Sequence, residues 1–159
     1  MKIVTKLAGL AVALTMVAGV AGMAVAESPH DGAVKARQGD MRLRAFNLGI
    51  LGAMAKGKIE YNAKAASAAA HNLKVLSTLN ASALWPAGSD AGAYGDATTA
   101  SADLWQNFPK VIEAAKAFNA AAGAMDAAAG KDLASLQAAI GGVGKACAGC
   151  HKPFRVKKD

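Results

Sequence analysis

The chain has 159 residues and a formal net charge of +7, which suits a single domain with one hydrophobic core. Its basic residues form no dense stripe interleaved with aromatic residues, so the charge does not indicate a nucleic-acid partner. Aromatic residues make up only 5% of the sequence, which is few for a core of this size. A large apolar cofactor would fill the missing volume.

Residues 1–26 have the pattern of a secretory signal peptide. Two lysines precede a long apolar stretch that ends in Ala24-Val25-Ala26, a small-x-small cleavage site. A membrane anchor is the alternative because the stretch approaches spanning length, but its many Ala and Gly residues favour the signal peptide. We therefore expect a periplasmic domain of residues 27–159, with charge +5 and no membrane attachment, whose lysines weakly steer acidic partners.

The remainder is rich in alanine and poor in β-branched residues, which favours helices over strands. The first predicted helix runs from about Ala33 to Ala55, after the start signals Pro29 and Asp31, and its apolar residues recur at helical spacing. Gly57, between two lysines, suits its C-terminal cap.

Three more helices are predicted, at about 63–79, from 101 or 102 to 128, and at 132–150. The segment 85–96 is rich in Gly, Pro and Asp and reads as a long loop. Pro109 indicates either an irregular first turn in the third helix or a later start. Four helices with one long crossover predict an all-α, antiparallel four-helix bundle.

The two cysteines of the chain stand in the sequence Cys147-Ala148-Gly149-Cys150-His151. C-x-x-C-H is the attachment signature of c-type haem. Two thiols about one helical turn apart can add across the two vinyl groups on one haem edge, and the following imidazole can ligate the iron. The sequence therefore predicts one haem c, bound covalently through Cys147 and Cys150, with His151 as iron ligand.

A redox disulfide, a structural disulfide and a zinc site are the alternatives for this motif. Redox C-x-x-C pairs are expected at a helix start after a strand, whereas this pair closes the last helix. Zinc needs two more ligands, and His30 and His71 lack useful spacing. All three alternatives are less well supported than haem attachment.

These features resemble the cytochrome c′ family: C-x-x-C-H on the last of four helices, Arg37-Gln38 near the start of the first, and Lys56-Gly57 closing it. The resemblance implies an antiparallel bundle, a haem buried near one end, and frequently a homodimer. It also implies that Arg37 and Gln38 lie at the haem propionates. Charge pairing supports this role for Arg37, whereas Gln38 is equally well read as a plain surface residue.

Met41 matches the family position that faces the distal side of the haem, four residues after Arg37 on the same helical face. In high-spin members this residue blocks the iron without bonding it, whereas low-spin relatives use a methionine there as the sixth ligand. Plain core packing is the other interpretation of a helical methionine. The Trp85-Pro86-Ala87-Gly88-Ser89 segment resembles the low-spin relatives and favours ligation.

The sequence thus predicts an exported monohaem cytochrome that transfers single electrons, with His151 and Met41 on the iron and a redox protein as partner. The alternative is a five-coordinate haem protein that binds NO or CO. An enzyme is not expected, because no distal acid–base pair for peroxide cleavage is evident. Small residues at Gly49, Gly52 and Ala53 allow close helix contact, which favours a homodimer unless they pack inside the bundle.

Overall fold

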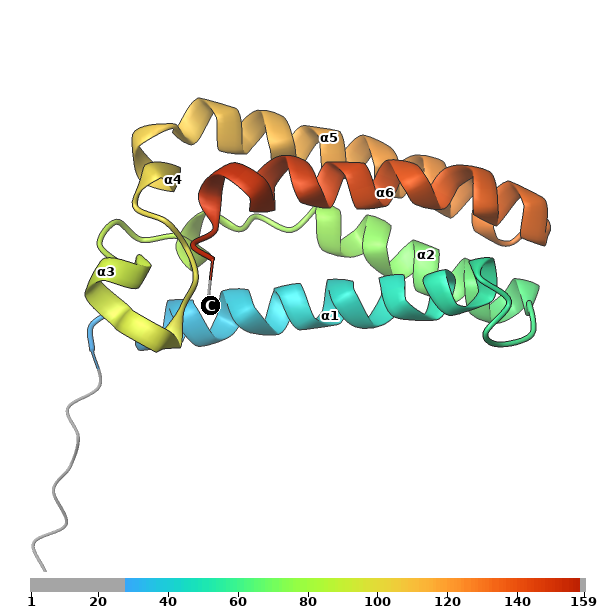
Figure 1. Ribbon diagram of the computed structural model, residues 1–159, viewed down its shortest axis with the longest axis horizontal. Coiled ribbons are helices and arrows are strands. Elements are labelled where there is room, and N and C mark those ends of the chain that lie inside the picture. The colour runs from blue at the N-terminus through green and yellow to red at the C-terminus, as the bar shows by residue number, and fades with distance from the viewer. Residues whose placement is uncertain (1–27, 158–159) are drawn as a thin grey trace, which may run out of the picture.

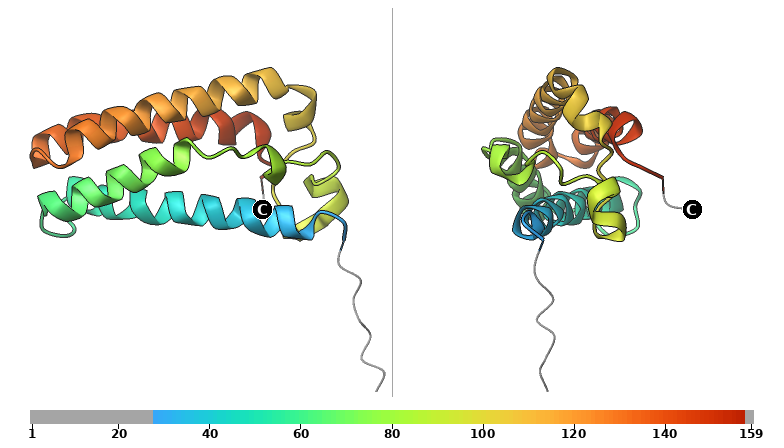
Figure 2. Two further views of the ribbon diagram at one scale, coloured as in Figure 1. Left: turned by 180° about the vertical axis from the view of Figure 1, so that it is seen from behind. Right: turned by 90° about the vertical axis from the view of Figure 1, so that its left-hand side faces the viewer.

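The computed structural model describes residues 28–157, which form a four-helix bundle, so the predicted all-α fold is confirmed (Figure 1). The signal-peptide prediction falls on residues 1–26, outside the described part. Consecutive long helices run antiparallel, and each packs on the next around the bundle (Figure 2). Within residues 28–157, no helix is long and apolar enough to cross a membrane. The long helices are α1 (Asp31–Ala55), α2 (Ala63–Ser77), α5 (Phe108–Ala129) and α6 (Leu133–Phe154).

The helix ends follow local capping chemistry. Gly57 has a φ of 64°, the left-handed conformation that closes α1, and the Lys58 N–H donates to the Ala53 carbonyl at 2.8 Å. At the start of α2 the Asn62 side chain accepts from the Ala65 N–H at 2.9 Å. Asp132 accepts in the same way at the start of α6. These signals explain why the predicted bounds lie close to the observed ones.

The hydrophobic core lies mainly between α1, α2, α5 and α6, and it is built largely from small residues. Alanines of α2 and α5 allow these helices to approach closely, and a few large side chains fill the space between them. Phe118 is the one aromatic residue in this buried cluster of the described chain. The fully or nearly fully buried members are Leu51, Met54, Ala66, Ala69, Ala70, Leu73, Phe118, Ala122, Met125, Ala129, Leu136 and Val143.

The crossover between α2 and α5 lies at the end of the bundle where α1 begins and α6 ends (Figure 1). It contains four short helical turns, and one of them, α3 (Ala91–Tyr94), lies within the segment 85–96 that the sequence predicts as a loop. The predicted third helix is likewise interrupted at Asn107, and α5 starts at Phe108 with Pro109 in its first turn, where no N–H partner is lost. The turns are η1 (Ser82–Leu84), α3 (Ala91–Tyr94), η2 (Gly95–Ala97) and α4 (Asp103–Gln106).

Helix α6 continues one turn beyond the predicted end at Cys150, through His151 to Phe154. Pro153 lies in its last turn, where the missing N–H removes only one helical hydrogen bond. At the end of α6 the crossover supplies a hydrogen-bond partner for the helix backbone, because the Ser101 N–H donates to the Phe154 carbonyl at 2.9 Å. This tertiary contact is what the local sequence could not predict.

Candidate functional site

The C-x-x-C-H motif occupies the C-terminal turns of α6. Cys147 and Cys150 are both half-buried and are free thiols. The two cysteines are three positions apart along the helix, so their side chains project from neighbouring turns, and His151 lies one turn beyond Cys147 on the same side. The two sulfur atoms and the imidazole are thus all carried by one short stretch of helix, with both thiols half-buried and the imidazole exposed.

The protonation of the thiols bears on the alternatives to haem attachment. Burial raises the pKa of Cys147, although the positive charge of Arg44 opposes this shift. Burial also raises the pKa of Cys150, and the neighbouring Cys147 adds to the shift. Both groups are therefore neutral thiols at pH 7, unlike the low-pKa thiolate of a redox C-x-x-C centre. Residues 28–157 also hold no cluster of three or more side chains that could bind a metal ion alone.

His151 presents a neutral imidazole. The side chain as a whole is exposed, but the protein packed against the ring desolvates it and lowers its pKa. The positive charge of Arg155 lowers the pKa further. A neutral ring has a free nitrogen lone pair, which an iron ligand requires.

The methionines and the other described histidines differ sharply in their surroundings. Met41 is 36% exposed on α1, whereas Met54 and Met125 are 3% and 0% exposed and belong to the core. Plain core packing therefore does not describe Met41. His71 is exposed on α2, with its Nδ1 3.6 Å from an Asp126 carboxylate oxygen, far in the chain from the motif.

Arg37 is almost completely buried, at 3% exposure, although it carries a charge. Its guanidinium donates to the Ser89 hydroxyl at 2.6 Å, to the Ser89 carbonyl and to the Thr98 hydroxyl at 2.8 Å. The guanidinium also lies 5.0 Å from the ring centroid of Trp85. Burial lowers the pKa of Arg37, and the nearby Tyr94 and Asp90 oppose the shift, so the group stays charged.

These contacts show a role for Arg37 and Gln38 that the sequence did not predict, which is to hold the crossover onto α1. The Gln38 side-chain amide donates to the Ala97 carbonyl at 2.6 Å, so Gln38 is not a plain surface residue. The partners lie 52 to 61 residues further along the chain. No local signal in the sequence pairs positions so far apart.

The crossover also binds the end of α6 just after His151. The Val156 N–H donates to the Thr99 carbonyl at 2.9 Å, and Ala100 and Arg155 form an isolated β-bridge. The Arg155 side chain donates to the Thr99 hydroxyl at 3.1 Å. One segment, residues 97–101, thus fastens the start of α1 to the end of α6.

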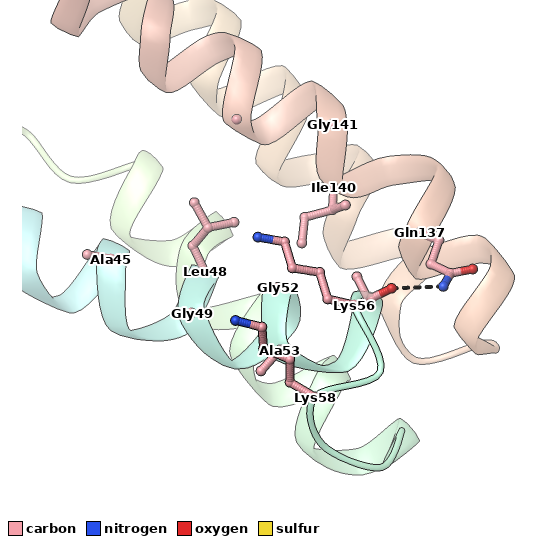
Figure 3. Close-up of a pocket in the computed structure, with 12 residues that line it drawn as sticks. Ala45, Leu48, Gly49, Gly52, Ala53, Lys56, Lys58, Gln137, Ile140 and Gly141 are labelled. Atoms are coloured by element: carbon pink, nitrogen blue, oxygen red, sulfur yellow. Dashed lines mark hydrogen bonds between the residues drawn. The ribbon is translucent and has the colours of Figure 1, made fainter.

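A groove of ≈ 840 Å³ runs between the C-terminal half of α1 and the N-terminal half of α6 (Figure 3). Apolar and small residues form most of its walls, together with two lysines and a glutamine near one end. A Cβ added at Gly49, Gly141 or Gly144 would meet nothing within 4 Å. Gly52 instead faces Ile140, where a Cβ would lie 3.9 Å from the Ile140 side chain. The lining residues are Ala45, Leu48, Gly49, Gly52, Ala53, Ala55, Lys56, Lys58, Gln137, Ile140, Gly141 and Gly144.

On both helices, the residues next along the chain from one end of the groove belong to the predicted haem site. Met41 lies one turn before the groove residue Ala45 on α1, and Cys147 lies about one turn after Gly144 on α6. The donor set, two neutral thiols and a neutral imidazole on α6 with an accessible thioether on the neighbouring α1, matches the chemistry of a c-type haem. The residues present therefore fit a covalently bound haem between α1 and α6.

Comparison with known proteins agrees with this site. The cytochrome C′ family profile matches residues 32–155. The chain is 40% identical over 124 residues to cytochrome c-554 of Cereibacter sphaeroides, covering 78% of this chain and 80% of that protein. It is 38% identical over 146 residues to a cytochrome c′ of the same organism, covering 92% and 96%.

Solved structures give the same result. The fold matches cytochrome c′ from Rhodobacter sphaeroides with a TM-score of 0.79 and 38% identity, covering 82% of this chain and all of that one. A cytochrome c prime from Alcaligenes xylosoxidans, 32% identical to this chain, has been solved as a leucine-to-alanine variant with nitric oxide bound, with a TM-score of 0.70. A leucine-to-glycine variant of the same protein carries carbon monoxide, with a TM-score of 0.69.

Proposed function

Because this chain belongs to the cytochrome c′ family, whose members carry covalently bound haem c, we propose that it is an exported monohaem protein that binds small diatomic gases such as NO or CO. The single haem is attached through Cys147 and Cys150, and His151 ligates the iron. The observation that supports this function best is the fold shared with a cytochrome c prime solved with NO and with CO bound. When bound, the haem would supply an iron able to take up a small gas, with His151 as its protein ligand.

The residues of the chain supply attachment and orientation. The Cys147 and Cys150 thiols would hold the haem by adding across its two vinyl groups, with each sulfur bonding one vinyl carbon and its proton going to the other. His151 brings a neutral imidazole from the same helix. Arg37 offers a buried cation for a propionate, because its hydrogen-bond partners Ser89 and Thr98 are uncharged.

Met41 governs access to the opposite face in this proposal. It lies on α1, the helix that faces the motif, and its side chain is accessible rather than locked in the core. A thioether held over the iron without bonding it slows the entry of a gas. That the protein is not an enzyme stays a prediction from the sequence.

Electron transfer is the second candidate function, because an accessible Met41 thioether is also free to bond the iron. If the Met41 sulfur bonds the iron, His/Met ligation raises the reduction potential and suits the transfer of single electrons to a redox protein. The gas would then have to displace the sulfur. The two functions differ in whether the Met41 sulfur bonds the iron, so one measurement distinguishes them.

The test is the spin state of the ferric holoprotein at neutral pH, read from its optical spectrum. Gas binding predicts a high-spin spectrum, and Met41→Ala should leave it high-spin while speeding CO binding to the reduced protein. Electron transfer predicts a low-spin spectrum that Met41→Ala converts to high-spin, with a lower reduction potential. Leu43→Ala, an exposed change on the same helix, should alter neither property.

A low-spin wild-type spectrum would overturn the gas-binding proposal in favour of electron transfer.

The signal peptide also predicts that the holoprotein is recovered from the periplasmic fraction. Recovery only from the cytoplasm would contradict export.

We propose in addition that the protein forms a homodimer, although not through the small residues first considered. Gly52 packs inside the bundle against Ile140, and Gly49 and Ala53 line the groove toward α6. Large apolar side chains are instead exposed on α1, on α2 and just after α2, where the Asn72 side chain donates to the Asn47 side chain. Such a patch is typical of a protein interface. Its members are Leu43, Phe46, Val75 and Leu79, each 46–67% exposed.

A further inference from the structure

An ion pair lies inside the bundle, on the side of α1 that faces α2 and α5. Asp40 is 9% exposed, and the Arg44 Nη2 lies 2.9 Å from a carboxylate oxygen of Asp40. The Arg44 Nε also donates to both Asp40 oxygens, each at 3.0 Å. Charged residues are seldom buried to this degree unless they are paired, and each such pair costs free energy to desolvate.

Arg44 is fixed by two further contacts. Its Nη2 donates to the Leu76 carbonyl of α2 at 2.8 Å, and its guanidinium lies 4.8 Å from the ring centroid of Phe118 on α5. Three elements therefore hold one cation in one place. A fixed charge in a partly buried position acts on its neighbours more strongly than a mobile surface charge does.

Arg44 and the haem attachment site border the same core cluster of the bundle. Cys147 packs against the core cluster that contains Phe118, the ring on which Arg44 stacks. The charge of Arg44 also acts on the Cys147 thiol and favours its ionised form. Arg44 is three residues from Met41 on α1, on a neighbouring part of the same helical face.

We propose that Arg44 is a fixed positive charge beside the haem that shifts the one-electron equilibrium toward the reduced state, and that Asp40 positions it and offsets part of its charge. Oxidised haem carries one more positive charge than reduced haem, so a nearby cation disfavours the oxidised form. A unit charge about 10 Å away, at an effective dielectric of about 20, changes such an equilibrium about tenfold. This inference rests on the proposed covalent haem, but not on which function the haem serves.

The experiment is a spectroelectrochemical titration of the holoprotein, in which the electrode supplies and removes the electron. Arg44→Gln should lower the ratio of reduced to oxidised haem about tenfold at a given applied potential, which is a midpoint about 59 mV lower. Asp40→Asn should shift the ratio the other way, and Asp40→Asn/Arg44→Gln should fall between the two. Arg42→Gln is the matched control, because it removes an exposed arginine from the same helix and should change the ratio less than twofold.

Arg44→Lys separates charge from packing, since it keeps the cation but loses the planar stack on Phe118. The midpoint potential of Arg44→Lys should stay near that of the wild type even if its thermal stability falls. This variant keeps the proposal testable if Arg44→Gln fails to fold. The ferric spectrum is recorded for each variant, so that a change of iron ligand is recognised. The proposal is overturned if Arg44→Gln shifts the midpoint no more than Arg42→Gln, or if Arg44→Lys shifts it as far as the neutral variant does. Haem that extracts from the wild type would instead refute the covalent attachment itself.

Discussion

Replacing Arg37 by alanine should release the crossover from α1 and destabilise the protein. The change removes a guanidinium that donates to both oxygens of Ser89 and to the Thr98 hydroxyl. Ser89 is 0% exposed and Thr98 is 6% exposed, so water cannot easily replace the lost donors. A hydrogen bond to a charged group contributes about 1.5–3 kcal/mol, and a buried acceptor left unpaired costs about 1–3 kcal/mol.

The partners of Arg37 keep some of their other hydrogen bonds, which limits the loss. The Ser89 hydroxyl still donates to the Pro86 carbonyl at 2.7 Å, and the Thr98 hydroxyl still accepts from the Ala100 N–H at 3.2 Å. The desolvation of the arginine is also recovered when it is removed. We therefore expect Arg37→Ala to lower the free energy of unfolding by about 3 kcal/mol, rather than by the sum of three hydrogen bonds.

Thermal unfolding of the holoprotein, followed by far-UV circular dichroism, measures this loss. About 3 kcal/mol corresponds to a Tm lower by roughly 10 °C for a domain of this size. Arg37→Lys should give an intermediate loss, because an ammonium keeps the charge but not the forked geometry. Hydrogen exchange should speed up first in residues 85–101.

Arg42→Ala provides the control, since Arg42 is exposed on the same helix and its loss should change the free energy by about 0.5 kcal/mol or less. Equal Tm values for Arg37→Ala and Arg42→Ala would refute the reasoning. So would a destabilised Arg37→Ala protein whose crossover exchanges no faster than that of the wild type.

Three further predictions concern attachment, assembly and backbone conformation. Haem should stay with the wild-type polypeptide through acid–acetone extraction and leave the Cys147→Ala/Cys150→Ala variant; free extraction from the wild type would contradict covalent attachment. Phe46→Glu should turn a dimer into a monomer in sedimentation equilibrium, because it places a charge on a side chain that is 67% exposed in the apolar patch; a wild type that is monomeric at every concentration would contradict the dimer. Gly57→Ala should cost about 1 kcal/mol in denaturant unfolding because its φ is 64°, whereas Gly39→Ala, inside α1 with open space at its Cβ, should be neutral or stabilising.

The four long helices could be predicted from the sequence because the signals that start and end them are local. The small residues of α2 and α5, the left-handed Gly57 and the cap residue Asp132 all act within a few positions of themselves. The C-x-x-C-H motif is also local, so its place on the last helix could be predicted. Where Pro109 left two interpretations, the structure selects the later helix start.

The parts that the sequence did not predict depend on contacts between distant segments. Arg37 was considered only as a haem contact, because nothing near it in the chain indicates Ser89 or Thr98 as partners. The extension of α6 to Phe154 depends likewise on the crossover backbone. The Asp40–Arg44 pair is different, since its i, i+4 spacing is visible in the sequence and only its burial is not.

The crossover connects these observations, because it binds both helices that face the haem site. Residues 97–101 contact Gln38 at the start of α1 and Val156 just beyond the end of α6. His151 lies on α6 next to one attachment point, and Met41 lies on α1 one turn beyond the other. The separation between these two side chains is therefore set by a segment that contains neither of them. With the haem bound as proposed, we expect the hydrogen bonds of Arg37 and Gln38 to the crossover to influence whether Met41 bonds the iron, in addition to stabilising the protein. Loosening them in Arg37→Ala should for this reason alter the ferric spectrum along with the Tm, whereas a purely structural role would change the Tm alone.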